Sequence, residues 1–251
     1  METDYASVVL ASPIWGLGSL GLSTIYYRCG DVDMYDSHGV NTGTLSDREA
    51  ALILSYAYSL SRLSLGANAK YVYQKIADDN ISTASDGMGA DISVLYRMYE
   101  SLTVGAVFHS KYKMTSSNDD TISGEVPLNI RAGIQYQAEM SRDNSLSFMM
   151  DFDQTRSYPL KLHVGMELVL YDVIAFRAGL DDLYAETRDA DIGYVDLIKR
   201  TCKPTLGLGF KWEIGQRGTS PDARQSALIL DYALSVEKLG LRNFFTLAYQ
   251  F

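Results

Sequence analysis

Side chains alternate between apolar and polar in segment after segment of this chain, and this alternation constrains its fold more than any other feature. In residues 63–73, Leu65, Tyr71 and Tyr73 fall on one side of an extended chain, whereas Asn68 and Lys70 fall on the other. Successive side chains of a β-strand point to opposite faces, so a period of two residues indicates a strand with one apolar face. The clearest segments are 52–60, 63–73, 90–98, 128–136, 146–153, 160–170, 174–180, 205–212, 228–234 and 245–251. This recurrence predicts an all-β, antiparallel protein.

The two faces of these segments differ in a way that does not suit a soluble β-sandwich. The apolar face is unbroken and often ends in Tyr, Phe or Trp, and the chain has 18 Tyr. The other face carries Gly, Ser, Asn and charged residues, which are too polar for the dry interior of a sandwich. In a transmembrane barrel the apolar face meets lipid, the polar face lines the interior, and aromatic residues mark both interfaces. We therefore predict an antiparallel transmembrane β-barrel.

The connections between the expected strands alternate in length. Short ones are expected at Pro13–Gly18, Ser61–Arg62 and Tyr171–Asp172, and long ones at Cys29–Glu49 and Asp181–Lys203. Bacterial barrels have short turns on the periplasmic side and longer loops outside, so this order favours the bacterial outer membrane as the location.

The number of expected strands bears on the domain organisation. We count about thirteen strands in residues 1–251, taken as a single barrel domain, whereas bacterial barrels have an even number. The opening sequence METDYASVV has neither the basic nor the apolar region of a signal peptide. We therefore expect a full barrel of about fourteen strands, whose N-terminal strand and signal peptide are missing from this sequence.

One motif suggests a nucleotide-binding protein, but its context does not. Gly16, Gly18 and Gly21 form a G-x-G-x-x-G pattern. A dinucleotide-binding turn must open a helix, and the residues after Gly18 instead alternate with a period of two. The net charge of −9 and the lack of a basic run also argue against nucleic-acid binding. The glycines therefore predict a hairpin turn that enters a strand.

Catalysis, metals and cofactors find no support in the sequence. The three histidines are scattered, and no G-x-S-x-G pattern of a serine hydrolase occurs. We expect no enzymatic activity, no metal site and no cofactor. Cys29 and Cys202 are either free thiols or a single disulfide.

Charged side chains on the polar face of the segments are the candidate functional residues, because they point into the barrel interior. They are Lys70, Asp91, Arg97, Arg131, Lys161, His163, Glu167, Arg177, Lys211 and Asp231. A buried charge needs a partner, so the competing interpretation is ion-paired filler. His163 and Glu167, two pleats apart on one strand, are either a proton-sensitive pair or a packed polar pair.

Several stretches together resemble the PorV/PorQ family of outer-membrane proteins, a branch of the FadL-like barrels. They are WGLGSLGLS (15–23), GANAKYVYQKI (66–76), VPLNIRAGIQYQ (126–137), FRAGL (176–180), LILDYALS (228–235) and FFTLAYQF (244–251). The resemblance implies a barrel of about fourteen strands. It also implies that the alternating Leu247, Tyr249 and Phe251 are the signal recognised by the barrel-assembly machinery.

Three functions follow from this resemblance. FadL-like barrels admit hydrophobic small molecules through the outer membrane, and this is the function that we favour. The alternative is a PorV-type carrier of the type IX protein secretion system, which would hold its cargo with the loops Gly30–Arg48, Lys75–Asp86, Ser110–Val126 and Asp182–Thr201. The third is a structural barrel without transport. The expected partners are outer-membrane lipid, the barrel-assembly machinery and either a hydrophobic solute or a secreted protein, but no nucleic acid.

Overall fold

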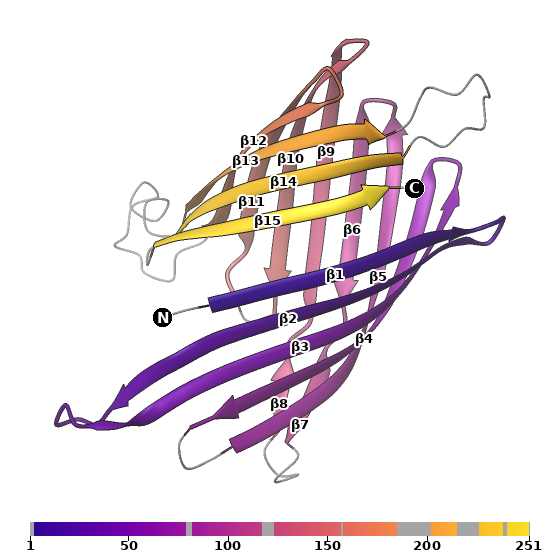
Figure 1. Ribbon diagram of the computed structural model, residues 1–251. Coiled ribbons are helices and arrows are strands. Elements are labelled where there is room, and N and C mark those ends of the chain that lie inside the picture. The colour runs from indigo at the N-terminus through magenta and orange to yellow at the C-terminus, as the bar shows by residue number, and fades with distance from the viewer. Residues whose placement is uncertain are drawn as a thin grey trace. The chain divides into compact units, whose positions relative to one another are not determined.

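The computed structural model describes residues 3–78, 82–116, 123–156, 158–184, 202–214, 226–237 and 240–250. The regular elements in these ranges are β-strands, which confirms the all-β prediction (Figure 1). The described ranges contain no α-helix with the length and apolar character of a membrane span.

The chain folds as two compact units. Unit 1 comprises Met1–Tyr96 and Ala106–Ile130, and unit 2 comprises Arg97–Gly105 and Arg131–Phe251. The strands that lie in unit 1 are β1 (Thr3–Ile14), β2 (Gly18–Tyr35), β3 (Asn41–Leu60), β4 (Leu63–Ala77), β7 (Tyr112–Ser116) and β8 (Ser123–Val126). Those in unit 2 are β10 (Asn144–Thr155), β11 (Lys161–Leu170), β12 (Ile174–Tyr184), β13 (Lys203–Ile214), β14 (Ser226–Glu237) and β15 (Gly240–Gln250). The division passes through β5 (Ser82–Tyr99), β6 (Leu102–His109) and β9 (Asn129–Ser141), so each of these strands contributes to both units.

Pairing follows the order of the chain in both units. In unit 1, the strands from β1 to β5 pair each with the next and antiparallel, and β7 pairs with both β5 and β8. In unit 2, the strands from β10 to β15 pair in the same way. Within the described ranges, thirteen strands form the main path of the sheet, and β7 and β8 lie off it. The main path thus confirms the predicted count of about thirteen strands.

The distribution of exposed and buried side chains is the reverse of that in a soluble protein. On β13, Leu206, Leu208 and Trp212 are 61%, 51% and 64% exposed, whereas Gly209 on the opposite face is buried. The buried hydrophobic residues of the described ranges are two alanines, while Asp91 and Asp153 are 6% and 8% exposed. A sheet that met water on its outer face would expose its charges and bury its leucines. The apolar face of the sheet is therefore suited to contact with the hydrocarbon core of a lipid bilayer.

Local backbone geometry confirms the predicted turn at the first glycines. Gly16 and Gly18 have φ values of +71° and +101°, and Leu17 N donates to Ile14 O at 2.9 Å. A Cβ atom on Gly18 would lie 2.3 Å from the carbonyl oxygen of Ala57. Since only glycine combines this φ with this close approach, the motif builds a hairpin and not a nucleotide-binding turn.

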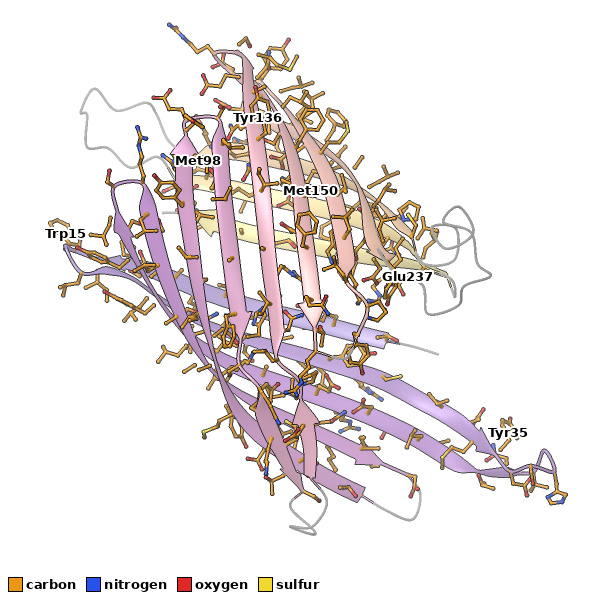
Figure 2. The ribbon with its side chains drawn as sticks, turned by 180° about the vertical axis from the view of Figure 1, so that it is seen from behind. Trp15, Tyr35, Met98, Tyr136, Met150 and Glu237 are labelled. Atoms are coloured by element: carbon orange, nitrogen blue, oxygen red, sulfur yellow. The ribbon has the colours of Figure 1, made fainter. Side chains whose placement is uncertain are left out.

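Several segments predicted as long loops are strands, and those predictions are wrong. β2 continues to Tyr35 and β3 begins at Asn41, so residues 36–40 alone connect them. In this turn the Asp36 carboxylate accepts hydrogen bonds from the backbone N–H groups of His38 and Val40 at 2.8 and 2.9 Å. Figure 2 shows Tyr35 at the far end of β2 from Trp15, which lies in the turn before the strand.

The same correction applies to two further connections. β4 continues to Ala77 and β5 begins at Ser82, and residues 112–116 and 123–126 form β7 and β8. Residues 185–201 of the fourth predicted loop lie outside the described residues. Sequence alternation missed these strands because each adds only a few residues, too few for a period of two to be recognised, and backbone pairing alone gives no periodic signal.

Candidate functional site

The less exposed face of unit 1 carries a compact group of charged side chains, the Asp91 cluster, formed by Lys70, Asp91, His109 and Tyr112. Lys70 Nζ donates a hydrogen bond of 2.7 Å to Asp91 Oδ1, and His109 Nδ1 lies 3.1 Å from the same oxygen. The Lys70 ammonium also lies 5.4 Å from the centre of the Tyr112 ring. Asp91 is thus held by two partners while being almost fully buried, as a buried carboxylate requires.

A glycine provides the space for this cluster. A Cβ atom on Gly89 would lie 2.8 Å from both Lys70 Cε and Tyr112 Cδ1. Gly89 is the register partner of Lys70 across the β4–β5 ladder, so any side chain there would displace the lysine or the tyrosine.

Unit 2 carries a second group, the Arg177 cluster, which bridges four strands. Glu167 on β11 stands directly opposite Arg177 on β12, and Arg177 Nε donates to Glu167 Oε2 at 2.5 Å. The same guanidinium donates through Nη1 to Asp231 Oδ1 on β14 at 2.5 Å, and thereby crosses β13. A Cβ atom on Gly209 of β13 would lie 2.5 Å from Asp231 Oδ1 and 2.8 Å from Arg177 Nη1. Because Gly209 has no side chain, the Arg177 guanidinium can pass over β13 and reach Asp231.

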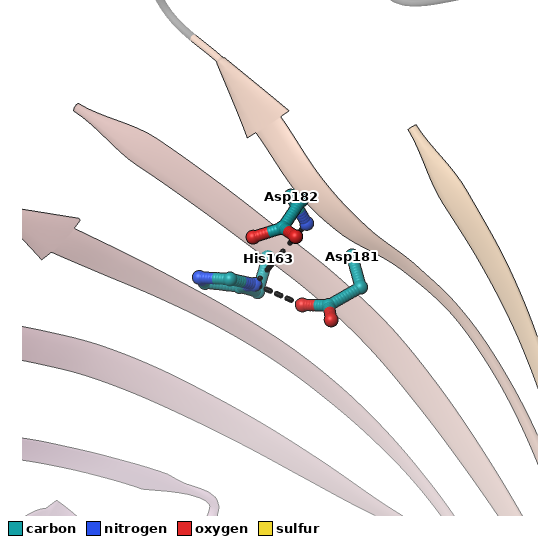
Figure 3. A group of neighbouring side chains, drawn as sticks. All are labelled: His163, Asp181 and Asp182. Atoms are coloured by element: carbon teal, nitrogen blue, oxygen red, sulfur yellow. Dashed lines mark hydrogen bonds and ion pairs between the residues drawn. The ribbon is translucent and has the colours of Figure 1, made fainter. Parts of the chain in front are cut away.

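A third group, the Asp182 cluster, owes its geometry to a β-bulge. The register of β11 against β12 shifts between Leu162 and Val164, so that Asp181 and Asp182 both stand opposite His163. Asp182 has a φ of +54°, which side-chain-bearing residues rarely adopt. A bulge re-aims side chains that would otherwise alternate, and Figure 3 shows both aspartates beside the imidazole. His163 Nδ1 is joined to Asp181 Oδ1 and accepts a 3.4 Å hydrogen bond from the Asp182 N–H.

Two lysines supply the positive charge of the Asp182 cluster. Lys161 Nζ lies 3.1 Å from Asp182 Oδ1, and Lys203 Nζ lies 2.6 Å from Asp182 Oδ2. Potential metal-ligand atoms of His163, Asp181 and Asp182 lie within 4.8 Å of one another, a grouping that sequence reasoning did not foresee. Both ammonium groups pair with the Asp182 carboxylate, whereas the Asp181 carboxylate is joined to His163, so the arrangement is an ion-pair network.

Cys29 lies in unit 1 and Cys202 in unit 2, so their pairing in a disulfide stays a prediction. Cys202 directly precedes β13. Burial raises the pKa of its thiol, and the negative charge of Asp181 raises it further.

Most of the predicted interior residues have a partner of opposite charge. In addition to the three clusters, Arg131 Nη2 donates to Asp153 Oδ2 at 2.6 Å. Lys211 instead lines a depression of 410 Å³ beside the β11–β12 turn, and Arg97 is exposed near the end of β5. These residues line the predicted face, but their role in transport stays a prediction.

The suggested pairing of His163 with Glu167 does not occur, because each has its own partner on β12. Sequence reasoning also missed His109, Tyr112, Asp182 and Lys203. Lys203 could have been found, since it continues the inward period of β13, whereas Tyr112 lies in a segment predicted as a loop and Asp182 is reoriented by the bulge.

No protein-family model matches the chain, and no curated protein matches it. Several solved structures do. The crystal structure of the Ralstonia pickettii toluene transporter TbuX is 13% identical, with a TM-score of 0.59 over 94% of this chain and 78% of that one. The Pseudomonas putida toluene transporter TodX is 12% identical, with a TM-score of 0.55 over 99% and 85% of the two chains. A Pseudomonas aeruginosa FadL homologue is 12% identical, with a TM-score of 0.53 over 97% and 75%.

These similarities, together with the exposed apolar face, establish the fold of the chain. It is an all-β, antiparallel transmembrane β-barrel whose fold is similar to that of the two toluene transporters and the FadL homologue. The named activities of the similar structures are transport and not catalysis.

Proposed function

We propose that this protein is a FadL-like channel of the bacterial outer membrane, through which hydrophobic small molecules pass passively. The observation that carries the proposal is the FadL-like fold combined with an outward apolar face, because such a barrel spans the membrane and encloses a path across it. Two of the similar proteins are toluene transporters. We expect no enzymatic activity and no cofactor.

Ion pairing on the inner face supports this proposal. Lys70 is neutralised by Asp91, Arg177 by Glu167 and Asp231, and Asp182 by two lysines. A wall whose charges are paired internally presents less net field to a passing molecule than a wall of free charges. We infer that these residues hold the wall together and leave selection to the shape and apolarity of the path.

The direct test is uptake by cells that lack their own hydrophobic-solute channel. Expression of the full protein in the outer membrane is expected to raise the initial uptake of radiolabelled toluene several-fold over cells with empty vector. Uptake of a disaccharide serves as the control and is expected to stay unchanged. Equal toluene uptake with and without folded protein in the outer membrane would refute the channel function.

The second candidate is a PorV-type carrier in type IX secretion. Its support is the ordered set of stretches that resemble the PorV/PorQ family, together with the long β2–β3 hairpin that such a carrier would offer to cargo. Affinity purification from a cell with this secretion system distinguishes it, because a carrier retains secreted proteins that a channel does not. If the protein neither raises toluene uptake nor retains secreted proteins, the structural barrel without transport is the remaining function.

Assembly by the barrel-assembly machinery is also part of the proposal. Leu247 and Tyr249 lie on β15, where every residue is exposed, and the third member of the signal, Phe251, lies outside the described residues. Deletion of Phe251 is expected to lower the folded amount in cells more than the stability of the purified protein. Wild-type amounts in the outer membrane after the deletion would exclude this role.

A further inference from the structure

Three cationic side chains form a line across β2, β3 and β4. Arg28 stands directly opposite Arg48 in the β2–β3 register, and Arg48 stands directly opposite Lys75 in the β3–β4 register. Direct partners of antiparallel strands point to the same face, with Cβ atoms about 4.5–5.5 Å apart. We call Arg28, Arg48 and Lys75 the cation row.

The cation row lies on the lipid-facing side of the sheet. The neighbouring row on the same face, two positions along each strand, consists of Tyr26, Ala50 and Tyr73. Beyond them this face of β3 is apolar from residue 50 to residue 60, about the 9–11 residues that a tilted strand needs to cross a bilayer. The row therefore lies just outside the hydrocarbon, at the level of lipid headgroups, with two tyrosines at the boundary.

This arrangement is unfavourable for the protein alone. Like charges directly opposite each other in a sheet destabilise it. Within the described residues, no ion pair reaches any member of the row, although Asp4 on β1 faces Arg28 in the register. The Nε atom of Arg28 is also buried without a hydrogen-bond partner in the described part of the chain. An anion at this position would relieve both the repulsion and the unsatisfied donor.

We propose that the cation row binds the phosphate groups of lipid A, the phosphorylated glycolipid of the outer leaflet. A phosphate offers several acceptor oxygens to a guanidinium fork, and two neighbouring arginines with a lysine match its charge. The short β1–β2 and β3–β4 turns lie at the other end of these strands, and short turns of bacterial barrels face the periplasm. The row therefore faces the leaflet that contains lipid A.

Two charge-matched double variants test the proposal with the full chain in detergent. Arg28→Gln/Arg48→Gln removes two charges from the row, and Arg62→Gln/Arg142→Gln removes two from short turns. Binding of bisphosphorylated lipid A is measured by native mass spectrometry and by fluorescence titration. The first variant is expected to lose about tenfold or more in affinity and the second less than about twofold, since each cation near an anionic lipid contributes about 1 kcal/mol.

Other lipids and anions show whether the phosphate of the lipid is what binds. Enzymatically dephosphorylated lipid A is expected to bind at least tenfold more weakly to the unaltered protein. Inorganic phosphate at about 1 mM is expected not to displace the lipid, because it lacks the acyl chains that pack against the apolar face. Equal affinity of the two double variants, equal binding of the dephosphorylated lipid, or displacement by inorganic phosphate would each overturn the proposal.

Folding of each variant is checked by its heat-dependent mobility in gel electrophoresis. If Arg28→Gln/Arg48→Gln does not fold, Lys75→Gln replaces it, and a loss of affinity of about fivefold is expected. An unchanged affinity in folded Lys75→Gln would then overturn the proposal. Toluene uptake is independent of this result, so failure of the lipid site and failure of the channel function are distinguishable.

Discussion

The two faces of the sheet meet opposite demands, and the contrast is clearest on β4. On its exposed face Leu65, Tyr71 and Tyr73 are 46%, 39% and 36% exposed. Their apolar surfaces can contact lipid without any hydrogen bond or ion pair. On the other face Lys70 is paired with the nearly buried Asp91. The protein thus leaves large apolar groups unburied and buries charges in pairs, which only a hydrocarbon surrounding makes favourable.

The two faces also differ in how they use small residues. On the inner face, Gly89 and Gly209 leave room for side chains that reach across strands to an ion-pair partner. Gly165, on the same face of β11, leaves more room, since a Cβ atom there would meet its nearest atom, Ala178 O, at 3.8 Å. The inner wall is therefore held together by cross-strand polar interactions, whereas the outer face depends on lipid.

The largest effect is expected from a charge on the exposed face. Val164 on β11 is 40% exposed. Its replacement by arginine is expected to destabilise the protein, because the charge then lies in hydrocarbon. We expect Val164→Arg to lower the free energy of unfolding in lipid vesicles by about 2–4 kcal/mol. Gln135→Arg on the less exposed face of β9 is the control and is expected to cost less than about 1 kcal/mol. Equal losses would show that the faces are wrongly assigned.

Crowding of the inner wall is expected to have the next largest effect. Gly209→Val places a branched side chain where Arg177 and Asp231 meet, and overpacking of this kind costs about 1–3 kcal/mol. Gly165→Ala meets no atom closer than 3.8 Å and should be nearly neutral. Urea titrations of both variants in lipid vesicles measure the difference. A destabilisation by Gly165→Ala as large as that by Gly209→Val would refute the role given to Gly209.

Removal of the shared cation in the Arg177 cluster is expected to have a moderate effect. Arg177→Met leaves Glu167 and Asp231 without their common partner, but the side chains involved are 26–40% exposed and water screens them. We expect a loss of about 1–2 kcal/mol. The double variant with Glu167→Gln should recover part of this loss, and no recovery would show that the two residues do not interact.

The smallest effect is expected at an exposed ion pair. Lys111 and Glu125 are 47% and 50% exposed, with Nζ and Oε2 2.8 Å apart. Lys111→Gln is expected to change the free energy of unfolding by less than about 1 kcal/mol. A loss larger than that of Arg177→Met would reverse the ranking of exposed and less exposed pairs.

The period of two in the side chains alone was sufficient to predict the fold class and most of the charged residues on the inner face. Lys70, Asp91, Glu167, Arg177 and Asp231 follow the period of two, and the structure pairs them as charges on a shielded face should be paired. Their partners across strands were not predictable, because pairing depends on register, which no single segment encodes.

Deviations from the regular strand explain what the sequence did not reveal. The bulge opposite His163 shifts the phase of Asp182, and a periodic pattern contains no signal for one extra residue. The extension of β3 from Asn41 is mostly polar on both faces, and the extension of β2 to Tyr35 is interrupted by two register shifts. Both segments were therefore predicted as loop although their backbones pair. Both features occur where the apolar face ends, and there the hydrocarbon no longer dictates the pattern.

A scan of β4 with spin labels tests the central claim most directly. Single cysteines at positions 65–74, in a protein with Cys29→Ser and Cys202→Ser, are labelled in lipid vesicles, and accessibility to oxygen and to a water-soluble nickel chelate is measured. Oxygen accessibility is expected to peak at 65, 67, 69, 71 and 73, and chelate accessibility at 66, 68, 70, 72 and 74, because oxygen concentrates in hydrocarbon. Maxima of both reagents at the same positions, or no period of two, would contradict an exposed face in lipid and an inner face in water.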